Sequence, residues 1–209
     1  MTLTLFGTTT SPFANKVRIS AQILGLWPRI RSVGVDLAAP GSGLRAVAPL
    51  QRIPVLVETD GSVIQDSTVI CQHLDALAGG GQLLPTDGTA RTRHLALAAL
   101  AEGTIEAGAL LRRENQRPRE LQSEAMIEKH LATLGRVMDA LTAQRERLGT
   151  SPDLAAITLV AGLDWIALRH GAYGLIDARP TLGDWLAHAH AQWVPAMPGD
   201  AFVKTDSEA

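Results

Sequence analysis

RIPVLVETDGSVIQDS, residues 52–67, is the stretch of the chain with the clearest local pattern. Residues 55–58 and 63–65 are rich in β-branched and apolar side chains, which favour strands. Asp60-Gly61 between them is a dipeptide typical of two-residue hairpin turns. The stretch therefore predicts a β-hairpin.

The two ends of this hairpin are also informative. Pro54 opens the first strand, where its missing N–H costs the ladder little, and we expect the Ile53-Pro54 peptide bond to be cis. Asp66 and Ser67 precede a helical pattern, and we predict that Ser67 is the N-cap. A helix N-terminus beside a strand edge suits a small peptide with a carboxylate.

Upstream of the hairpin, strands and helices alternate. Ser11 followed by Pro12 is a strong helix start, although an N-cap serine needs no chemistry to explain it. The periodicity predicts strands at 3–6 and 30–35, helices at 12–25 and 67–78, and one helical turn at 44–48. With the hairpin, the order β-α-β-α-β-β-α is that of a thioredoxin-like domain.

Downstream, the chain is predicted to be helical. Three glycines at 79–81 mark the most probable domain boundary. We predict a first domain at 1–78, a linker at 79–88 and an all-helical domain at 89–209. Its expected helices span 90–115, 121–148, 153–170 and 181–192, followed by an irregular tail from Pro195. Residues 40–43 are expected to form a loop.

Composition indicates an ordinary soluble protein. The 209 residues are 46% apolar and carry a net charge of −2, which gives no reason to expect binding to nucleic acid or membrane. No apolar run approaches the roughly 18 residues of a membrane span. The N-terminus reads as a strand rather than as a signal peptide. The single cysteine, Cys71, excludes an internal disulfide and is consistent with the cytoplasm.

Three segments resemble the cytosolic-type glutathione S-transferases. Residues 11–18, SPFANKVR, are similar to the S-P-F-x-x-K-V-R opening of serine-type bacterial members. Residues 52–67 are similar to the family's glutathione site, and residues 99–118 to its fourth helix. The resemblance covers nearly the whole chain except its last dozen or so residues.

The resemblance implies a glutathione site in the first domain. Ser11 would donate its hydroxyl to the glutathione sulfur, and Thr10 is the alternative donor. The remaining implied contacts are Arg52 to the glycyl carboxylate, Ile53 before Pro54 to the cysteinyl backbone, and Asp66 and Ser67 to the γ-glutamyl end. Without the resemblance, each of these residues also has an ordinary structural role.

A pocket for a second substrate is expected between Phe13 and the inward face of the helix at 90–115. Glu102, Glu106 and Arg113 are its candidate charged residues, although charges on a helix are usually solvent-exposed. The six histidines show no metal-ligand spacing, so we expect glutathione as co-substrate and no metal.

Two functions remain open at this stage. The first is an enzyme that transfers glutathione to a small electrophile or uses it to reduce a peroxide. The second is a non-catalytic binding or structural protein with the same fold. The resemblance also implies a homodimer, and the small residues of the fourth helix would allow close helix approach at its axis: Ala98, Ala99, Ala101, Gly103, Ala107 and Gly108.

Overall fold

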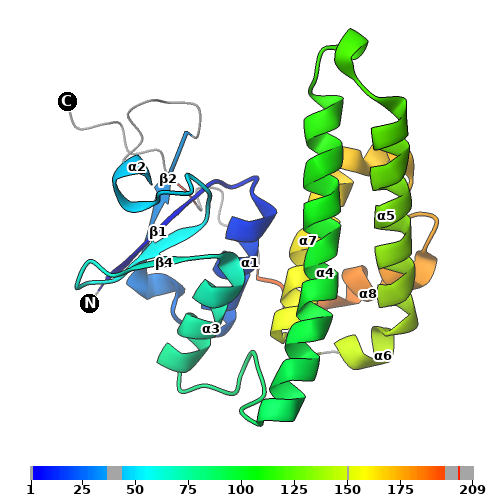
Figure 1. Ribbon diagram of the computed structural model, residues 1–209. Coiled ribbons are helices and arrows are strands. Elements are labelled where there is room, and N and C mark those ends of the chain that lie inside the picture. The colour runs from blue at the N-terminus through cyan, green and yellow to red at the C-terminus, as the bar shows by residue number, and fades with distance from the viewer. Residues whose placement is uncertain (1, 37–43, 150, 196–201, 203–209) are drawn as a thin grey trace. The chain divides into compact units, whose positions relative to one another are not determined.

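A computed structural model describes residues 2–36, 44–149, 151–195 and 202 (Figure 1). The loop expected at 40–43 lies outside these residues, as does the expected tail apart from Pro195 and Phe202. The chain forms two compact units. The first comprises residues 1–84 together with the end of the chain from Pro195, and the second comprises residues 85–194.

The first unit contains a four-stranded sheet in the order β2-β1-β3-β4. Strand β1 is parallel to β2 and antiparallel to β3, which is antiparallel to β4. The elements are β1 Leu3–Gly7, α1 Pro12–Ile23, the 3-10 turn η1 Trp27–Arg29, β2 Ile30–Gly34, α2 Leu44–Val47, β3 Val55–Val57, β4 Val63–Gln65 and α3 Ser67–Leu77. The predicted thioredoxin-like order is confirmed.

Strand β3 is buried on both faces of the sheet. Val55 and Leu56 are both fully buried, and neighbouring side chains of a strand point to opposite faces. Val55 packs in a cluster with Leu44 and Ala48 of the α2 segment. On the face where Leu56 lies, α1 and α3 run side by side (Figure 1).

The hairpin has a three-residue loop instead of the predicted two-residue turn. Val57 pairs with Val63, and the Glu58 N–H donates to Ser62 O at 2.9 Å, so the ladder continues one residue beyond the strands. Gly61 has φ of +88°, the left-handed conformation that glycine adopts without steric cost. The Asp60-Gly61 signal was correct for a hairpin but not for its length.

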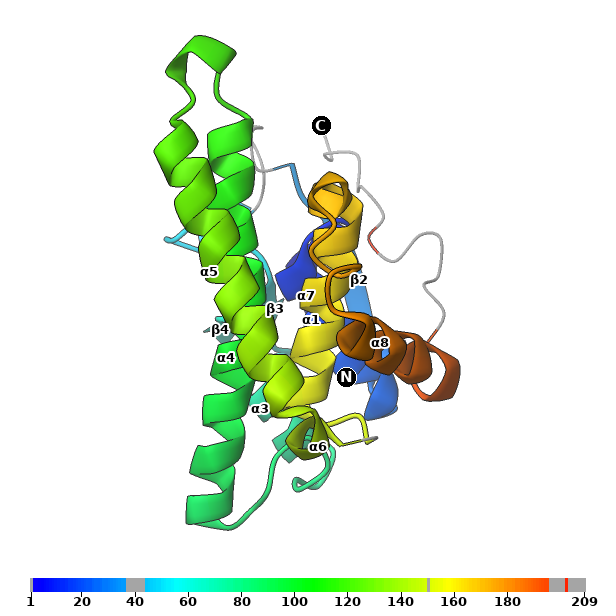
Figure 2. The same ribbon diagram turned by 90° about the vertical axis from the view of Figure 1, so that its right-hand side faces the viewer.

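The second unit consists of helices. They are α4 Gly88–Asn115, η2 Arg119–Leu121, α5 Glu124–Ala143, α6 Arg145–Leu148, α7 Leu154–His170, η3 Gly171–Tyr173 and α8 Pro180–Gln192. Figures 1 and 2 show α4 and α5 side by side, with α7 against α4. The single helix predicted at 121–148 was wrong: its start is η2, and it breaks at Gln144 before the short α6.

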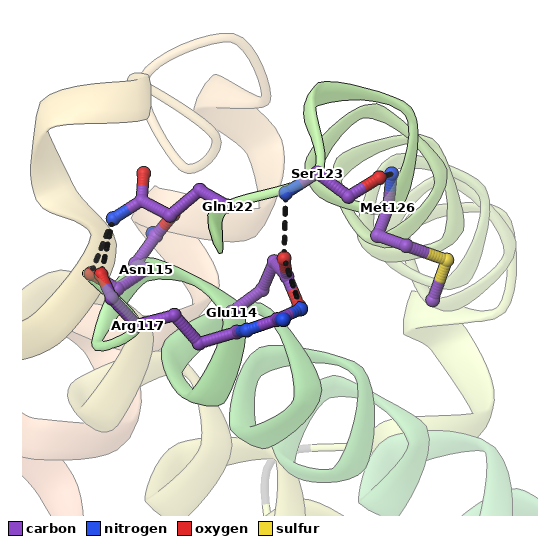
Figure 3. A network of polar contacts seen from close by, with 6 residues as sticks. All are labelled: Glu114, Asn115, Arg117, Gln122, Ser123 and Met126. Atoms are coloured by element: carbon purple, nitrogen blue, oxygen red, sulfur yellow. Dashed lines mark hydrogen bonds and ion pairs between the residues drawn. The ribbon is translucent and has the colours of Figure 1, made fainter. Parts of the chain in front are cut away.

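The turn between α4 and α5 is closed by a polar network (Figure 3). Glu114 accepts from the Ser123 N–H at 2.7 Å and from Arg117 at 3.1 Å. The Ser123 N–H and then Arg117 hold the pKa of the Glu114 carboxyl below its usual value. Gln122 donates to the backbone oxygens of Asn115 and Arg117 at 3.2 and 2.8 Å.

Helix α7 is the core of the second unit. Asp153 caps it by accepting from the Ala156 N–H at 2.9 Å. By length and composition, α4 and the helical segment Leu154–Tyr173, which joins α7 to η3, are both long and apolar enough to cross a membrane, but 72% of the most apolar stretch of the second segment is buried within the protein. Burial among helices therefore accounts for the apolar composition of α7.

Two glycines allow α4 and α7 to approach closely. A Cβ at Gly162 of α7 would overlap Thr104 Oγ1 of α4, and a Cβ at Gly108 of α4 would lie 2.8 Å from Trp165 and Ile166. Thr104 faces Gly162, and Gly108, one turn later in α4, faces Ile166, one turn later in α7. The two helices are therefore parallel. Four of the six small residues expected at a dimer axis, Ala98, Ala101, Ala107 and Gly108, are buried within the chain, and Gly108 lies against Trp165 and Ile166 of α7.

Phe202, which lies in the tail left unassigned by the resemblance, packs on the first unit. Its ring lies 6.4 Å from that of Trp27, edge to face. A Cβ at Gly7 would lie 2.6 Å from the Phe202 ring and 3.0 Å from the Ala14 Cβ. Phe202 therefore belongs with the sheet, and Gly7 provides the space for it.

Gly162→Ala should destabilise the protein by about 1–3 kcal/mol, because the new methyl group overpacks the α4–α7 contact. Gly103→Ala is the matched control, since its Cβ would lie 3.5 Å from Val137, an ordinary contact. It should leave stability unchanged or raise it by up to about 1 kcal/mol through helix propensity. Urea unfolding measures both, and equal midpoints for the two variants would contradict the prediction.

His170 predicts a pH dependence of stability. Burial lowers the pKa of this side chain, and the charges of Arg112 and Arg169 lower it further. In the unfolded chain the pKa returns to about 6.5. Between the two values the unfolded state binds more protons, so the free energy of unfolding falls as pH falls below about 6.5.

His170→Gln should therefore flatten the change in stability between pH 7.5 and pH 5, whatever its own stability at pH 7.5. His188→Gln, at an exposed position of α8, controls for the substitution of histidine by glutamine itself and should keep the wild-type slope. Urea unfolding across this pH range tests the difference. A wild-type slope in His170→Gln would show that another group causes it.

Candidate functional site

One row of paired residues brings three separate segments to the same end of the sheet. Val55, the first residue of β3, pairs with Phe6 of β1 on one side and with Gln65 of β4 on the other. The loop to Ser11 follows Phe6, the Ile53-Pro54 peptide precedes Val55, and Asp66 and Ser67 follow Gln65. These segments were predicted to form a glutathione site, and the sheet register gathers them.

Ser11 is held at the start of α1 by its own hydrogen bonds and those of its neighbours. Its N–H donates to Thr8 O at 3.2 Å, and Asn15 Nδ2 donates to Thr9 O at 3.1 Å. Its Oγ accepts from the Ala14 N–H at 3.3 Å, so Ser11 is the N-cap of α1. Because the oxygen is the acceptor in that bond, the hydroxyl proton remains available to donate. Capping and a role towards sulfur are therefore compatible.

The alternative donor, Thr10, is exposed in the turn before Ser11. The Ile53-Pro54 peptide bond is cis, as predicted. Ile53 is half-buried and Arg52 is exposed, both in the segment that leads into β3. The sheet register thus brings Ile53 near the Ser11 loop, while the contact of Arg52 with a ligand stays a prediction.

The N-cap of α3 is Asp66, and the prediction of Ser67 as N-cap was wrong. Asp66 Oδ1 accepts from the N–H groups of Thr68 at 2.8 Å and Val69 at 3.2 Å, and Asp66 O accepts from Ile70 N–H at 2.9 Å. Asp66 has φ of +74°, an uncommon conformation for a residue with a side chain. The carboxylate satisfies two helix N–H groups where the shorter serine side chain satisfies one.

This cap affects the role expected of Asp66 and Ser67. Both bonds use Oδ1, so Oδ2 of this exposed residue remains as an acceptor for a ligand ammonium. Asp66 engages the N–H groups of residues 68–70, and the Ser67 N–H is the remaining donor of this first turn. Ser67 itself is 3% exposed.

Lys16 is the first of two site residues that sequence reasoning missed. It is fully buried, and its Nζ donates to Ser67 Oγ at 3.1 Å and to Thr68 Oγ1 at 2.6 Å. A lysine in the second turn of an amphipathic helix normally reads as a solvent-exposed charge. The only signal for it was its place in the SPFANKVR segment, where the resemblance fixed a lysine without explaining it.

Gln65 is a second residue that sequence reasoning missed. Its Oε1 is buried and has no hydrogen-bond partner within the part of the chain that the structure describes. A buried acceptor without a donor is costly, which makes this atom a candidate contact for a donor group of a ligand. The residue directly precedes Asp66.

The residues predicted for a second-substrate pocket fall in both units. Phe13 is half-buried in α1, whereas Glu102, Glu106 and Arg113 lie along one stripe of α4. Glu102 is half-buried and the other two are exposed, so a shared pocket stays a prediction. Among the described residues, no group of three or more His, Cys, Asp or Glu side chains is placed to hold a metal ion.

Cys71 is a buried core residue. It is fully buried in α3, and its Sγ lies 3.3 Å from Ser20 Oγ of α1. This contact lies one helical turn beyond the contact between Lys16 and Ser67. The two helices are therefore parallel, and their N-termini point to the same end of the first unit.

Comparison with known proteins identifies relatives that cover most of the chain. Residues 5–82 match the family described as "Glutathione S-transferase, N-terminal domain". The uncharacterised GST-like protein YibF of Escherichia coli (strain K12) is 28% identical over 182 residues, which cover 85% of this chain and 89% of that protein.

Two solved structures share both sequence and fold with the chain. A glutathione transferase family member from Pseudomonas fluorescens Pf-5, with bound glutathione, is 31% identical with a TM-score of 0.83, covering 93% of this chain and 100% of that one. A glutathione S-transferase from Methylobacillus flagellatus, also with glutathione bound, is 30% identical with a TM-score of 0.85, covering 96% and 99%. The chain therefore belongs to the glutathione S-transferase family.

Proposed function

We propose that the protein is a cytoplasmic glutathione transferase that conjugates glutathione to a small electrophile or uses it to reduce a peroxide. The observation that carries the proposal is the row Phe6–Val55–Gln65, which gathers two helix N-termini and the Ile53-Pro54 peptide at one end of the sheet. Glutathione bound to the Pseudomonas and Methylobacillus relatives supports the choice of ligand.

In this proposal, glutathione contacts the segments that flank this row of paired residues. The backbone of Ile53 pairs with the cysteinyl residue, and Arg52 contacts the glycyl carboxylate. The γ-glutamyl carboxylate accepts from the Ser67 N–H and hydroxyl at the N-terminus of α3, where the helix dipole favours an anion. Asp66 Oδ2 accepts from the γ-glutamyl ammonium.

The chemistry depends on the thiolate. A thiol has an ordinary pKa of about 8.5, and the thiolate is the nucleophile. The Ser11 hydroxyl donates to the sulfur at the N-terminus of α1, and both effects favour the anion. The thiol proton leaves to solvent, and the sulfur forms its new bond as the halide leaves an aryl halide, or adds to an enone whose enolate then takes a proton from water. With a hydroperoxide, the sulfur takes the outer oxygen as the alcohol leaves, and the resulting sulfenic acid condenses with a second glutathione to give the disulfide and water.

A non-catalytic ligand-binding or structural protein of the same fold is the second candidate, because the glutathione held by the Pseudomonas and Methylobacillus relatives is evidence of binding by those proteins and is compatible with either function. Retention on immobilised glutathione tests binding, and a panel of aryl halides, enones and hydroperoxides then tests turnover. Retention with no turnover on any of these would favour the second candidate. Absence of both would contradict the proposal.

Ser11→Ala should raise the pKa of bound glutathione and lower turnover with a model electrophile, because the sulfur loses its donor. Ser123→Ala is the matched control: Ser123 is the N-cap of α5, and its Oγ accepts from the Met126 N–H at 3.4 Å. Each variant should lose about 0.5–2 kcal/mol of stability through the lost cap. Ultraviolet titration of the bound thiol separates the two variants.

The titration also decides between the candidate donors. If Ser11→Ala and Ser123→Ala leave the same thiol pKa as the wild type, Ser11 is only a cap. Thr10→Ala is then the variant expected to raise the pKa of the thiol. If neither raises it, hydroxyl activation of the sulfur is wrong.

We also propose a homodimer, as implied by the family. Exposed apolar side chains in the first unit, Val63 of β4 and Val69 of α3, offer surface for the contact, since they are 39% and 48% exposed. Light scattering at micromolar concentration should give twice the 22.2 kDa mass of one chain. The mass of a single chain would refute the dimer but would not contradict the proposed glutathione site.

A further inference from the structure

The ammonium of Lys16 contacts the first turn of α3, and a cation is not expected at a helix N-terminus. Acidic groups are favoured at helix N-termini because the helix dipole places partial positive charge there. Lys16 is fully buried, and its Nζ contacts the hydroxyls of the first two residues of α3, Ser67 and Thr68, at 3.1 and 2.6 Å. Helix dipole and ammonium thus create positive potential at one place.

Asp66 carries the opposite charge at this terminus but binds the backbone. Its Oδ1 accepts from Thr68 and Val69 N–H groups at 2.8 and 3.2 Å. The N-terminus of α3 therefore has the exposed carboxylate of Asp66 and the buried ammonium of Lys16 close to its first turn. This pair of charges matches a zwitterionic α-amino acid group, whose ammonium and carboxylate are held on one carbon atom.

Hydrogen-bond direction at Ser67 supports the same assignment. An ammonium group donates three hydrogen bonds and accepts none. The Ser67 oxygen is therefore the acceptor from Lys16, and its own O–H proton must point to another group. Lys16 in this way fixes the Ser67 hydroxyl as a donor, next to the Ser67 N–H. Two donors on one residue can serve the two oxygens of one carboxylate.

We propose that Lys16 is a positioning residue that orients Ser67 and charges the N-terminus of α3 for the α-carboxylate of the γ-glutamyl group. This inference rests on the proposed glutathione site and names the part of the ligand that the α1–α3 contact selects. Lys16 acts through Ser67, 51 residues away in the sequence, without touching the sulfur.

The test compares two ligands by calorimetry. One is glutathione, and the other is 4-aminobutyryl-cysteinylglycine, which lacks only the γ-glutamyl α-carboxylate. The wild type should prefer glutathione. Lys16→Met should weaken glutathione binding about tenfold or more, the loss expected for a hydrogen bond to a charged group. It should change binding of the analogue less than twofold.

Ser20→Ala is the matched control. Ser20 is fully buried in the same α1–α3 contact, one turn beyond Lys16, with its Oγ 3.3 Å from Cys71 Sγ. It should keep the wild-type preference for glutathione. Lys16→Gln, which retains a donating amide, should also lower the preference and serves if Lys16→Met does not fold.

Each other outcome overturns a specific statement. If Lys16→Met and Lys16→Gln bind both ligands as the wild type does, or lose affinity for both equally, Lys16 has no role towards the carboxylate. If Ser20→Ala lowers the preference as much, the effect belongs to packing of the helices. A wild type that binds neither ligand overturns the proposed function and this inference with it.

Discussion

The pairing of Val55 with both of its neighbours is the constraint on which the site depends. Strand β3 has only three residues, yet it joins β1 to β4 and is buried on both faces. A shift of one residue in its register would turn Val55 and Leu56 to the wrong faces of the sheet. It would also displace Ile53 relative to Ser11 and Ser67, so packing of the core and alignment of the site are one requirement.

Local signals were sufficient to predict most of the first unit. The proline and the Asp-Gly dipeptide located the hairpin, Ser11-Pro12 located the start of α1, and periodicity gave the order of elements that the structure confirms. Errors arose where two local solutions are nearly equal. Asp66 and Ser67 are both good caps, and the choice of Asp66 depends on the backbone conformation that follows β4.

Features that depend on distant segments were not predictable from the pattern. Lys16 is fully buried and bonds to Ser67 and Thr68 of α3, and no residue near Lys16 in the sequence predicts that contact. The partner of the small residues of α4 was likewise not predictable. They suggested a helix contact correctly, but the structure uses Gly108 for Trp165 and Ile166 of the same unit. A pattern of small residues predicts that another element can pack closely on the helix, but it does not identify that element.

Phe202 makes the first unit discontinuous along the chain. The ring that packs against Gly7 and Trp27 is separated from them by all of the helices of the second unit. During synthesis, the sheet and its helices leave the ribosome early, whereas Phe202 emerges only after all of the helices of the second unit. The packing around Gly7 and Trp27 is therefore completed only after the helical unit has been made.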